Sequence, residues 1–361
     1  EDTGRYYSYD WGDAHFTSLD SNLLFSDANE RMLNWLRRDL ARTRKFWKIV
    51  YFHHPPYPTG HHIADPVAGL VREQVLPILE AAGVQLSISG HEHGYERSHT
   101  VRGGLVVQEG PSTTYIITGG GGAGLHALGA LPQTAVTLSL FHYMRFDVDG
   151  YSITGRALDG SGNTLDRFVV SPKPELKANG IVNGGDFTPA VAPGSLAVLF
   201  GNNLAIREFA ASAPFPSELG DLTLTVNGEP AQLLYVSPSQ VNFLVPESAP
   251  AVAPVELQAP HGSVKTQLVI SECAPAILSV RPGTDGRLAA YVTGFSRWIH
   301  EISVWVGGTV IDEPGKVQTS LVGPGVYRVD IGPLALPAGE YSLRVAARNS
   351  LSAPASFRIS G

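Results

Sequence analysis

The sequence predicts an α/β domain followed by an all-β region. Three observations carry this prediction. Up to about residue 171, apolar strand-like runs alternate with amphipathic helical patterns, which is typical of an α/β layer. Residues 172–180 are polar and proline-bearing without periodicity, which predicts a linker. Beyond them, short strand-like runs are separated by glycine and proline with no clear helical stripe, which indicates β-sandwiches.

Length and composition limit what this protein can be. With 361 residues, the chain is long enough for two or three domains. Charged residues make up 16% and the net charge is -7, so nothing resembles the basic footprint of a nucleic-acid-binding protein. No apolar run reaches the length of a membrane span. Cys273 is the single cysteine, which excludes an internal disulfide framework, and we expect it to be a small buried residue.

The strands of the α/β part are predicted from short apolar runs. These runs cover residues 13–21, 46–52, 84–89 and 114–118. Residues 141–170 have the pattern of a β-hairpin with a longer return. The order is therefore strand, helix, strand, helix, strand, and then antiparallel strands.

Two helices are predicted between these strands. Residues 26–44 carry apolar side chains at helical spacing, with Ser26 or Asp27 as the expected N-cap. Residues 66–82 carry a second stripe, and Pro77 inside it predicts a kink.

The all-β region has the pattern of two related modules. Residues 222–230 resemble residues 302–310, an offset of 80. We therefore expect a domain over 1–171, a linker over 172–180, and β-sandwich modules over 181–275 and 276–361.

Two histidine clusters follow apolar runs. They are "VYFHHPPYPTGHH" over 50–62 and "GHEHGYERS" over 90–98. If the preceding strands are parallel neighbours, His53, His91 and His93 converge at one sheet edge. Imidazole is a common metal ligand, so the pattern predicts a metal site. On an extended backbone His91 and His93 would face the same side, and they could serve one metal ion or two.

The two clusters resemble the C-terminal half of the calcineurin-like metallophosphoesterases, in particular the purple acid phosphatase branch with its V-x-x-H and G-H-x-H-x-Y-E-R motifs. The resemblance covers about residues 5–171, including the segments at 6–21 and 115–125. It implies a β-sandwich flanked by helices and built from two half-repeats. It also implies a dinuclear metal centre of iron with zinc, manganese or iron.

The resemblance assigns roles to individual histidines. His53 and His91 would bind the second metal ion and His93 the first. His62, or His61 as the alternative, would contact the phosphate or protonate the leaving group. In such a centre two metal ions clamp the phosphate oxygens, and a hydroxide derived from water attacks phosphorus in line.

Three further residues receive roles from the same resemblance. Tyr57 would line the substrate pocket. Glu96 and Arg97 would form a structural pair that fixes the motif loop.

The N-terminal half of such a domain supplies D-x-G, G-D-x-x-Y and G-N-H-[ED], and none of these motifs stands in this sequence. We therefore expect that the first half-repeat is missing, and that this chain alone binds metal weakly and hydrolyses little. A half-built sheet would also leave an open edge and an uncovered face.

Several other features are expected to be structural. The glycine run at 119–124 matches G-x-G-x-x-G, but no helix start follows it, so a dinucleotide site is not predicted. His15, His126 and His142 are single histidines for which we expect structural roles.

The all-β region resembles an immunoglobulin-like module of the IPT/TIG kind, frequent in large secreted proteins of soil Acidobacteria. Trp298, Trp305 and Tyr327 could form a platform for glycans, although core positions in a sandwich are the favoured interpretation. These features predict a secreted, periplasmic or cell-surface protein that hydrolyses phosphate esters, with no nucleic-acid partner. The alternative is a non-catalytic surface or glycan-binding protein with a vestigial phosphatase part.

Overall fold

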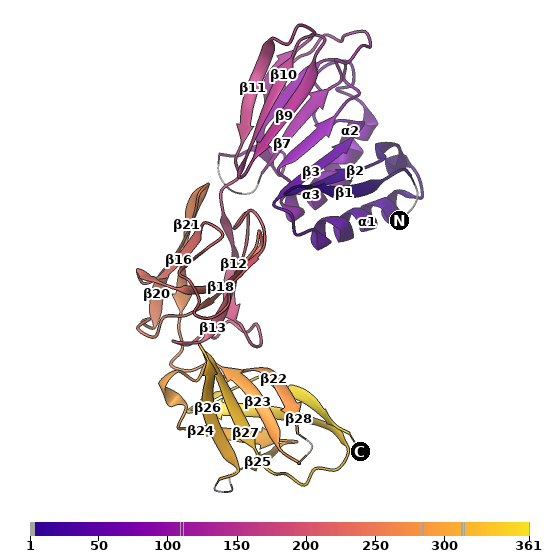
Figure 1. Ribbon diagram of the computed structural model, residues 1–361. Coiled ribbons are helices and arrows are strands. Elements are labelled where there is room, and N and C mark those ends of the chain that lie inside the picture. The colour runs from indigo at the N-terminus through magenta and orange to yellow at the C-terminus, as the bar shows by residue number, and fades with distance from the viewer. Residues whose placement is uncertain are drawn as a thin grey trace. The chain divides into compact units, whose positions relative to one another are not determined.

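The computed structural model describes residues 4–108, 110, 112–283, 285–311, 313 and 315–360. The chain divides into two compact units, with the boundary between Glu175 and Leu176. The first unit is α/β and the second is built from strands (Figure 1). The predicted fold class, an α/β part followed by β-sandwiches, is confirmed.

A large mixed sheet forms the centre of the first unit. Its strands lie in the order β1-β2-β3-β4-β7-β5-β6, with β8 beside β5. The pairs β2–β3, β3–β4 and β4–β7 are parallel, and the other pairs are antiparallel. The strand bounds are β1 Tyr7–Trp11, β2 Ala14–Ser18, β3 Trp47–Phe52, β4 Leu86–Ser89, β5 Tyr95–Arg102, β6 Leu105–Val106, β7 Thr113–Thr118 and β8 Thr134–Leu138.

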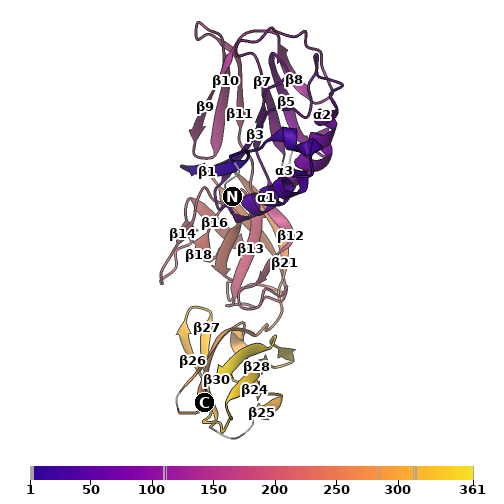
Figure 2. The same ribbon diagram turned by 90° about the vertical axis from the view of Figure 1, so that its right-hand side faces the viewer.

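A smaller antiparallel sheet follows in the chain. It has the order β11-β10-β9, with bounds β9 Tyr143–Asp149, β10 Ser152–Leu158 and β11 Thr164–Val170. The predicted hairpin and return are therefore correct. The small sheet covers one face of the large sheet, and the helices cover the other (Figures 1 and 2).

The first helix, α1 (Asn29–Arg42), buries the predicted stripe but has a different cap. Ala28 occupies the N-cap position and makes no side-chain cap bond, so the expected cap at Ser26 or Asp27 is wrong. The Ser26 hydroxyl instead closes the preceding 3-10 turn η1 (Ser21–Phe25) by donating to a backbone carbonyl. The buried side chains of α1 are Met32, Leu33, Trp35, Leu36 and Leu40.

The second helix is interrupted, as Pro77 predicts. It runs as α2 (Pro66–Leu70), one π-helical stretch (Val71–Val75) and α3 (Leu76–Ala82). Proline has no N–H to donate to the carbonyl four residues back, and its ring collides with that carbonyl. The wider π-helical turn directly before α3 absorbs this mismatch, so the segment continues instead of ending.

Alternating residues of β3 face the two layers around the large sheet. Val50 and Phe52 belong to the core cluster shared with the helices. Trp47 is fully buried, and its indole Nε1 donates to the Gly150 carbonyl oxygen at 2.9 Å, in the turn between β9 and β10. Trp47 therefore ties the large sheet to the small one.

The outer strand β1 exposes a row of aromatic side chains. Tyr7, Tyr9 and Trp11 are 48%, 47% and 79% exposed, and Tyr9 stacks on Phe16 of β2 with ring centroids 5.1 Å apart. In the described part of the chain, β1 pairs with β2 alone. The open edge that the sequence predicts is present, and unpaired edges of this kind are sites of association.

Behind β1, His15 joins two acidic side chains. Its Nδ1 lies 2.7 Å from Asp10 Oδ1, and its Nε2 lies 3.0 Å from Asp39 Oδ2. A carboxylate can only accept, so His15 satisfies both partners by donating from both nitrogens, as the charged imidazolium. Burial lowers the pKa of His15, but the hydrogen bonds to Asp39 and Asp10 outweigh it and raise the pKa above its usual value. Its expected structural role is thereby supported.

This network predicts a pH dependence of stability. A histidine whose folded pKa is raised contributes stability that is complete below its unfolded pKa of 6.5 and is lost as pH rises through the folded value. We expect the stability advantage of wild type over His15→Gln to shrink between about pH 6 and pH 8. Hydrogen exchange of β2 amides measures the stability of the first unit alone. If the stability difference between wild type and His15→Gln did not depend on pH, His15 would be uncharged in the folded protein.

The second unit begins with a β-sandwich. One sheet has the order β12-β13-β19-β18-β14, and the other has the order β15-β16-β20-β21 with β17 beside β16. Apolar side chains from both sheets form one core cluster. The bounds are β12 Glu175–Asn183, β13 Leu196–Asn202, β14 Phe209–Ala210, β15 Glu218–Leu219, β16 Leu222–Val226, β17 Glu229–Pro230, β18 Gln232–Val236, β19 Gln240–Leu244, β20 Val252–Ala259 and β21 Gly262–Val269.

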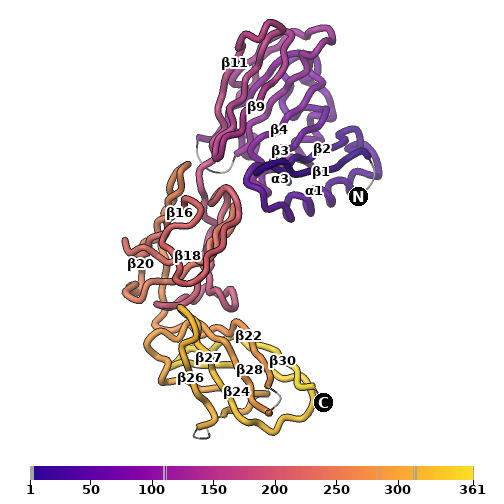
Figure 3. Tube along the Cα trace, in the orientation of Figure 1, coloured from indigo at the N-terminus to yellow at the C-terminus, as the bar shows by residue number. Residues whose placement is uncertain are grey.

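A second sandwich follows with its own core cluster. Its sheets have the orders β22-β23-β27-β26 and β25-β24-β28-β29, with β30 beside β28. Figure 3 shows the chain of this sandwich in orange and yellow. The bounds are β22 Ala276–Pro282, β23 Leu288–Thr293, β24 Ile302–Val306, β25 Thr309–Ile311, β26 Val317–Gly323, β27 Val326–Ile331, β28 Gly339–Ala347, β29 Ser350–Leu351 and β30 Ala355–Ile359.

The two sandwiches share their strand order. The path β12-β13-β19-β18 matches β22-β23-β27-β26, and the path β17-β16-β20-β21 matches β25-β24-β28-β30. The similar segments at 222–230 and 302–310 lie on the equivalent hairpins β16–β17 and β24–β25. The topology is therefore that of an internal repeat. The immunoglobulin-like and IPT/TIG resemblance stays a prediction.

The linker predicted over 172–180 is mostly a strand. Residues 175–183 form β12, which hydrogen-bonds to β13 at the edge of the first sandwich. Residues 172–180 are polar because β12 is an edge strand with exposed side chains. Without buried apolar residues at alternate positions, the sequence does not indicate a strand there. No helix among the described residues combines the length and apolar character needed to cross a membrane.

Candidate metal centre

The two histidine clusters meet at the edge where β3 and β4 end. The strands are parallel neighbours, and the Gly90 N–H donates to the His53 carbonyl oxygen at 3.1 Å directly beyond them. His53 and His54 follow β3, and His91 follows β4. The topology therefore brings His53 and His91 together, as the sequence predicts.

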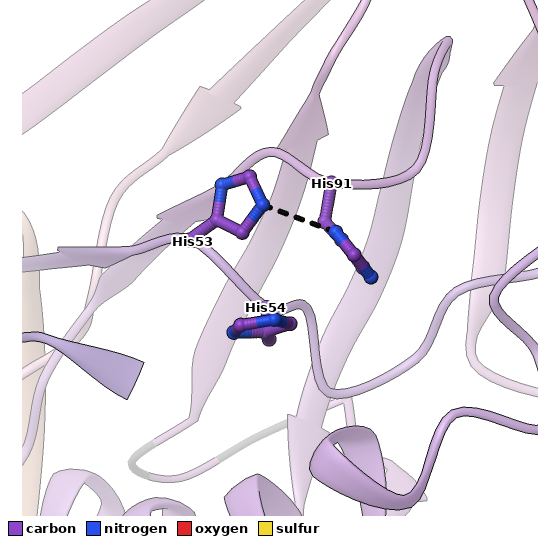
Figure 4. Close-up of side chains that lie close together, drawn as sticks. All are labelled: His53, His54 and His91. Atoms are coloured by element: carbon purple, nitrogen blue, oxygen red, sulfur yellow. Dashed lines mark hydrogen bonds between the residues drawn. The ribbon is translucent and has the colours of Figure 1, made fainter. Parts of the chain in front are cut away.

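The facing nitrogens of His53 and His91 define the centre of this site (Figure 4). His53 Nε2 lies 3.0 Å from His91 Nδ1. His91 Nε2 lies 3.0 Å from Asp65 Oδ2. Because a carboxylate only accepts, Nε2 of His91 carries the proton, and Nδ1 is left with a lone pair directed at His53.

Asp65 has a second function that fixes its position. Its Oδ1 accepts from the Val67 N–H at 2.9 Å and caps helix α2. Burial raises the pKa of Asp65, but the bonds from Val67 and His91 outweigh it and hold the pKa below its usual range. The ionised carboxylate therefore sets the tautomer of His91, a role that sequence motifs did not indicate.

The donor set fits a metal ion. Two nitrogens bound to one ion at about 2.0–2.1 Å lie about 3 Å apart, which matches the separation of His53 Nε2 and His91 Nδ1. Among the residues that the structure describes, two groups offer three ligand atoms within 4.8 Å of one another: His53, His54 and His91, and His62, Asp65 and His91. His91 is common to both.

Burial favours the neutral form of several imidazoles around this point, and the neutral form is the one that binds metal. Burial and the positive charge that His91 and His53 could carry lower the pKa of His54 to about 4. Burial first, and neighbouring histidines second, also lower the pKa values of His53 and His62. His54 Nδ1 pairs with the Ser21 hydroxyl at 2.8 Å, so His54 has a partner outside the centre. His54 belongs to the histidine cluster at 50–62, but the family resemblance assigns no role to it.

His93 lies apart from the His53–His91 pair. The segment after β4 is a series of tight turns, with the Glu92 N–H donating to Gly90 O and the Gly94 N–H donating to Glu92 O. The extended backbone that would align His91 and His93 is therefore absent, and His91 itself has φ +67°. His93 donates from Nδ1 to the Gly124 carbonyl at 2.8 Å, which leaves Nε2 for a ligand. Separate metal positions for the two histidines fit this geometry.

Glu92 was not singled out from the sequence, yet it organises the loop that carries His61 and His62. Its carboxylate is fully buried and accepts from the backbone N–H groups of Gly60, His61 and His62 and from the His126 ring. Burial raises its pKa, but these hydrogen bonds, led by that from His62, hold the pKa of Glu92 below its usual range. The backbone of His61 and His62, the predicted substrate residues, is therefore held by the buried Glu92 carboxylate.

His126, for which we expect a structural role, lies beside the histidines of the two motifs. Its ring lies 5.1 Å from the ring of His61, 5.4 Å from that of His62 and 4.2 Å from that of His93. His126 follows the glycine run and is far from the motifs in sequence, so spacing gave no signal for it. His142 is structural as expected, with its Nε2 3.0 Å from the Thr118 hydroxyl.

The glycine run at 119–124 serves close packing. A Cβ on Gly119 would lie 2.1 Å from Glu92 O, and one on Gly120 would lie 2.4 Å from His142 Nδ1. No helix follows the run before β8, so the rejection of a dinucleotide site agrees with the structure.

Tyr57 faces a different cavity. Its ring makes an edge contact with Tyr115 at 5.4 Å, and it lines a cavity of about 470 Å³ together with Arg72 and Glu80. Burial and the nearby Glu80 raise its pKa. The described contacts do not place Tyr57 among the histidines.

Glu96 and Arg97 do not form the predicted pair. They are adjacent on β5, and successive strand residues point to opposite faces. Arg97 Nε donates to Asp166 at 2.7 Å, beside the Tyr95 hydroxyl, which also donates to Asp166 at 2.7 Å. Glu96 instead accepts from the Thr59 N–H at 3.2 Å, and burial raises its pKa to about 7. Glu96 therefore supports the loop at Thr59, whereas Arg97 joins β5 to β11 through Asp166.

The aromatic residues proposed as a glycan platform belong to the second sandwich. Trp298 and Tyr327 pack against its core, and Trp298 also lies under the guanidinium of Arg348 at 4.0 Å. Trp305 lies on β24 between the buried Val304 and Val306 and points to the other face. The favoured interpretation as core aromatics therefore holds for Trp298 and Tyr327. Cys273 is buried, as expected.

Comparison with known proteins agrees with the site. Residues 3–95 match the calcineurin-like phosphoesterase family. Purple acid phosphatase 15 of Arabidopsis thaliana is 30% identical over 120 residues, which cover 32% of this chain and 22% of that protein. Purple acid phosphatase 18 of the same plant is 33% identical over 126 residues, which cover 33% and 28%. The chain thus spans about a quarter of the length of these relatives.

Among solved structures, a purple acid phosphatase from yellow lupin (Lupinus luteus) seeds is similar, with 19% identity and a TM-score of 0.43, covering 46% of this chain and 33% of that one. The matched segment lies within the first unit and contains the histidine edge, so this part of the chain is similar to calcineurin-like phosphoesterases. Within that family, the purple acid phosphatases are the relatives that it resembles.

Proposed function

We propose that this chain is the C-terminal part of a metal-dependent phosphoric ester hydrolase of the purple acid phosphatase type, acting on phosphomonoesters. The observation that carries the proposal is the pair of nitrogens, His53 Nε2 and His91 Nδ1, that face each other at 3.0 Å beside the Asp65 carboxylate. The family match supports a hydrolase.

The residues of this chain have distinct tasks in the proposed reaction. His53 and His91 hold one metal ion, of a centre that pairs iron with zinc, manganese or iron, and His93 contributes to the other. When bound, such a pair of ions polarises phosphate oxygens and supplies a hydroxide for attack on phosphorus. His62, with its ring centroid 3.7 Å from that of His91, would bind the phosphoryl group and, when it carries a proton at acidic pH, would protonate the leaving alkoxide. His61 is the alternative acid.

We propose that this chain alone holds metal incompletely, because the D-x-G, G-D-x-x-Y and G-N-H-[ED] ligands are absent from its sequence. Equilibrium dialysis against zinc should give at most about one ion per chain, with weak binding, because a tight site needs three or four protein ligands. Hydrolysis of a chromogenic phosphomonoester should be close to background. Two tightly bound ions per chain would contradict the proposal that ligands are missing, and no zinc binding at the histidine edge would contradict the metal site itself.

We also propose that the protein acts outside the cytoplasm, in the periplasm or at the cell surface. The support is the two consecutive β-sandwiches of the second unit, each built around its own apolar core. Fractionation of cells that express the native gene, with detection by an antibody against the tail, tests this. Recovery in the cytoplasmic fraction would overturn it.

A further inference from the structure

We infer that His126 is a third imidazole that contacts the phosphoryl group, together with His61 and His62, and that Glu92 is the positioning residue that holds all three. This inference rests on the proposed phosphoesterase function and adds to it a residue that follows neither histidine motif.

Glu92 has the contacts of a clamp. Oε2 accepts from the N–H groups of Gly60 at 3.1 Å and His62 at 2.9 Å. Oε1 accepts from the His61 N–H at 3.1 Å and from His126 Nδ1 at 2.6 Å. With no exposed surface, the carboxylate has these four donors in place of water.

Packing locks the two loops against each other. A Cβ on Gly60 would lie 2.7 Å from the Ala127 carbonyl oxygen and 2.8 Å from Glu92 Oε1. The Gly129 N–H donates to the carbonyl oxygen of Thr59 at 3.1 Å. The loop that carries His61 and His62 and the loop that carries His126 are therefore held together by these contacts.

The rings form an arc between the two histidines assigned to different metal ions. From His91 to His62 the ring centroids are 3.7 Å apart, from His62 to His126 they are 5.4 Å apart, and from His126 to His93 they are 4.2 Å apart. His62 and His126 are the middle members of this arc, so a phosphoryl group bound beside His62 would also lie within reach of His126.

His126 is suited to bind substrate rather than metal. Neither set of ligand atoms within 4.8 Å of one another, among the described residues, includes it. Because Nδ1 is engaged by Glu92 Oε1 at 2.6 Å and also lies 3.3 Å from the His93 backbone nitrogen, Nε2 is the nitrogen left to share a hydrogen bond with a phosphoryl oxygen. The His126 side chain is 21% exposed and the His62 side chain 22%, so solvent reaches both.

Carbethoxylation by diethyl pyrocarbonate, read by peptide mass spectrometry, tests the inference on the full chain in excess zinc, because zinc binding to this chain alone is expected to be weak. Inorganic phosphate should slow the modification of His61, His62 and His126 at the same midpoint concentration. His99 is exposed in the same unit and outside the cluster, so its rate should not change. A merely structural His126 would show no dependence on phosphate.

Two variants sharpen the test. His126→Asn, which leaves the backbone donors of Glu92 intact, should weaken phosphate binding about tenfold or more, because a hydrogen bond to an anion is lost. Glu92→Gln should raise amide exchange over residues 59–62 and remove the protection of all three histidines. His99→Asn is the matched control and should bind phosphate like wild type.

The outcomes separate this inference from the function on which it rests. Zinc alone should slow the modification of His53 and His91, and failure to do so would overturn the proposed metal centre. If zinc protects those two but phosphate leaves the rate at His126 unchanged, the inference is wrong and the metal centre stands. Phosphate affinity within twofold of wild type for His126→Asn would also overturn it.

Discussion

Replacing His91 by alanine is expected to lower zinc affinity at the histidine edge by more than about 100-fold. His91 belongs to both groups of candidate ligands, and its Nδ1 faces His53 at 3.0 Å. Loss of a partner that only orients a metal ligand costs about 10–100-fold, so loss of the ligand itself should cost more. Isothermal titration with zinc, or competition with a chromophoric chelator, measures the change.

The matched control is His99→Ala, because His99 is an exposed histidine of the same unit outside the cluster. Its zinc affinity should remain within about twofold of wild type. Unchanged affinity in His91→Ala would mean that zinc binds elsewhere, and the facing nitrogens of His53 and His91 would have to share a proton instead. The same zinc titration on a variant that keeps His91 but carries substitutions in the second unit shows whether zinc binds to that unit.

The sequence predicted the parts of the site that depend on local patterns. The apolar runs of β3 and β4 are typical of buried parallel strands, and parallel neighbours place the residues that follow them at one edge. That reasoning is sufficient to bring His53 and His91 together. The kink at Pro77 was also predictable, because proline removes a backbone donor wherever it stands in a helix.

Contacts between distant loops could not be predicted in this way. Glu92 and His126 are 34 positions apart and meet because two loops fold over one buried carboxylate. No periodicity marks such a contact, and a lone histidine in a sequence is most often an ordinary polar residue. The Glu96–Arg97 pair failed for a related reason, since neighbours in sequence on a strand face opposite sides and find separate partners.

The internal order of the β tail was visible in the sequence, whereas its first strand was not. The repeated pattern of β16 and β24 survives because both strands alternate buried and outward positions against a core. β12 lies at a sheet edge and exposes much of its surface, so it has no comparable alternation. Edge strands are where patterning is weakest, and the predicted linker was placed on one of them.

Replacing Trp47 by alanine is expected to destabilise the first unit by about 3–5 kcal/mol, as for other large-to-small changes in a core. Trp47 is 0% exposed, packs edge-on against Phe46 at 5.1 Å, and donates to the Gly150 carbonyl at 2.9 Å. The change would leave a cavity between the two sheets and an unpaired carbonyl oxygen. Urea unfolding followed by hydrogen exchange of β3 and β10 peptides gives the free energy for this unit, and the second unit serves as an internal reference.

Two further variants divide this effect into its causes. Trp47→Phe keeps most of the ring but loses the donor, so it should cost clearly less than alanine, including about 1 kcal/mol for the hydrogen bond. Trp11→Ala is the surface control, because Trp11 is 79% exposed, and its cost should stay within about 0.5 kcal/mol. If Trp47→Ala cost no more than Trp11→Ala, the small sheet would not be anchored through Trp47. The face of the large sheet that carries Trp47 would then have to be stabilised by its aliphatic contacts alone.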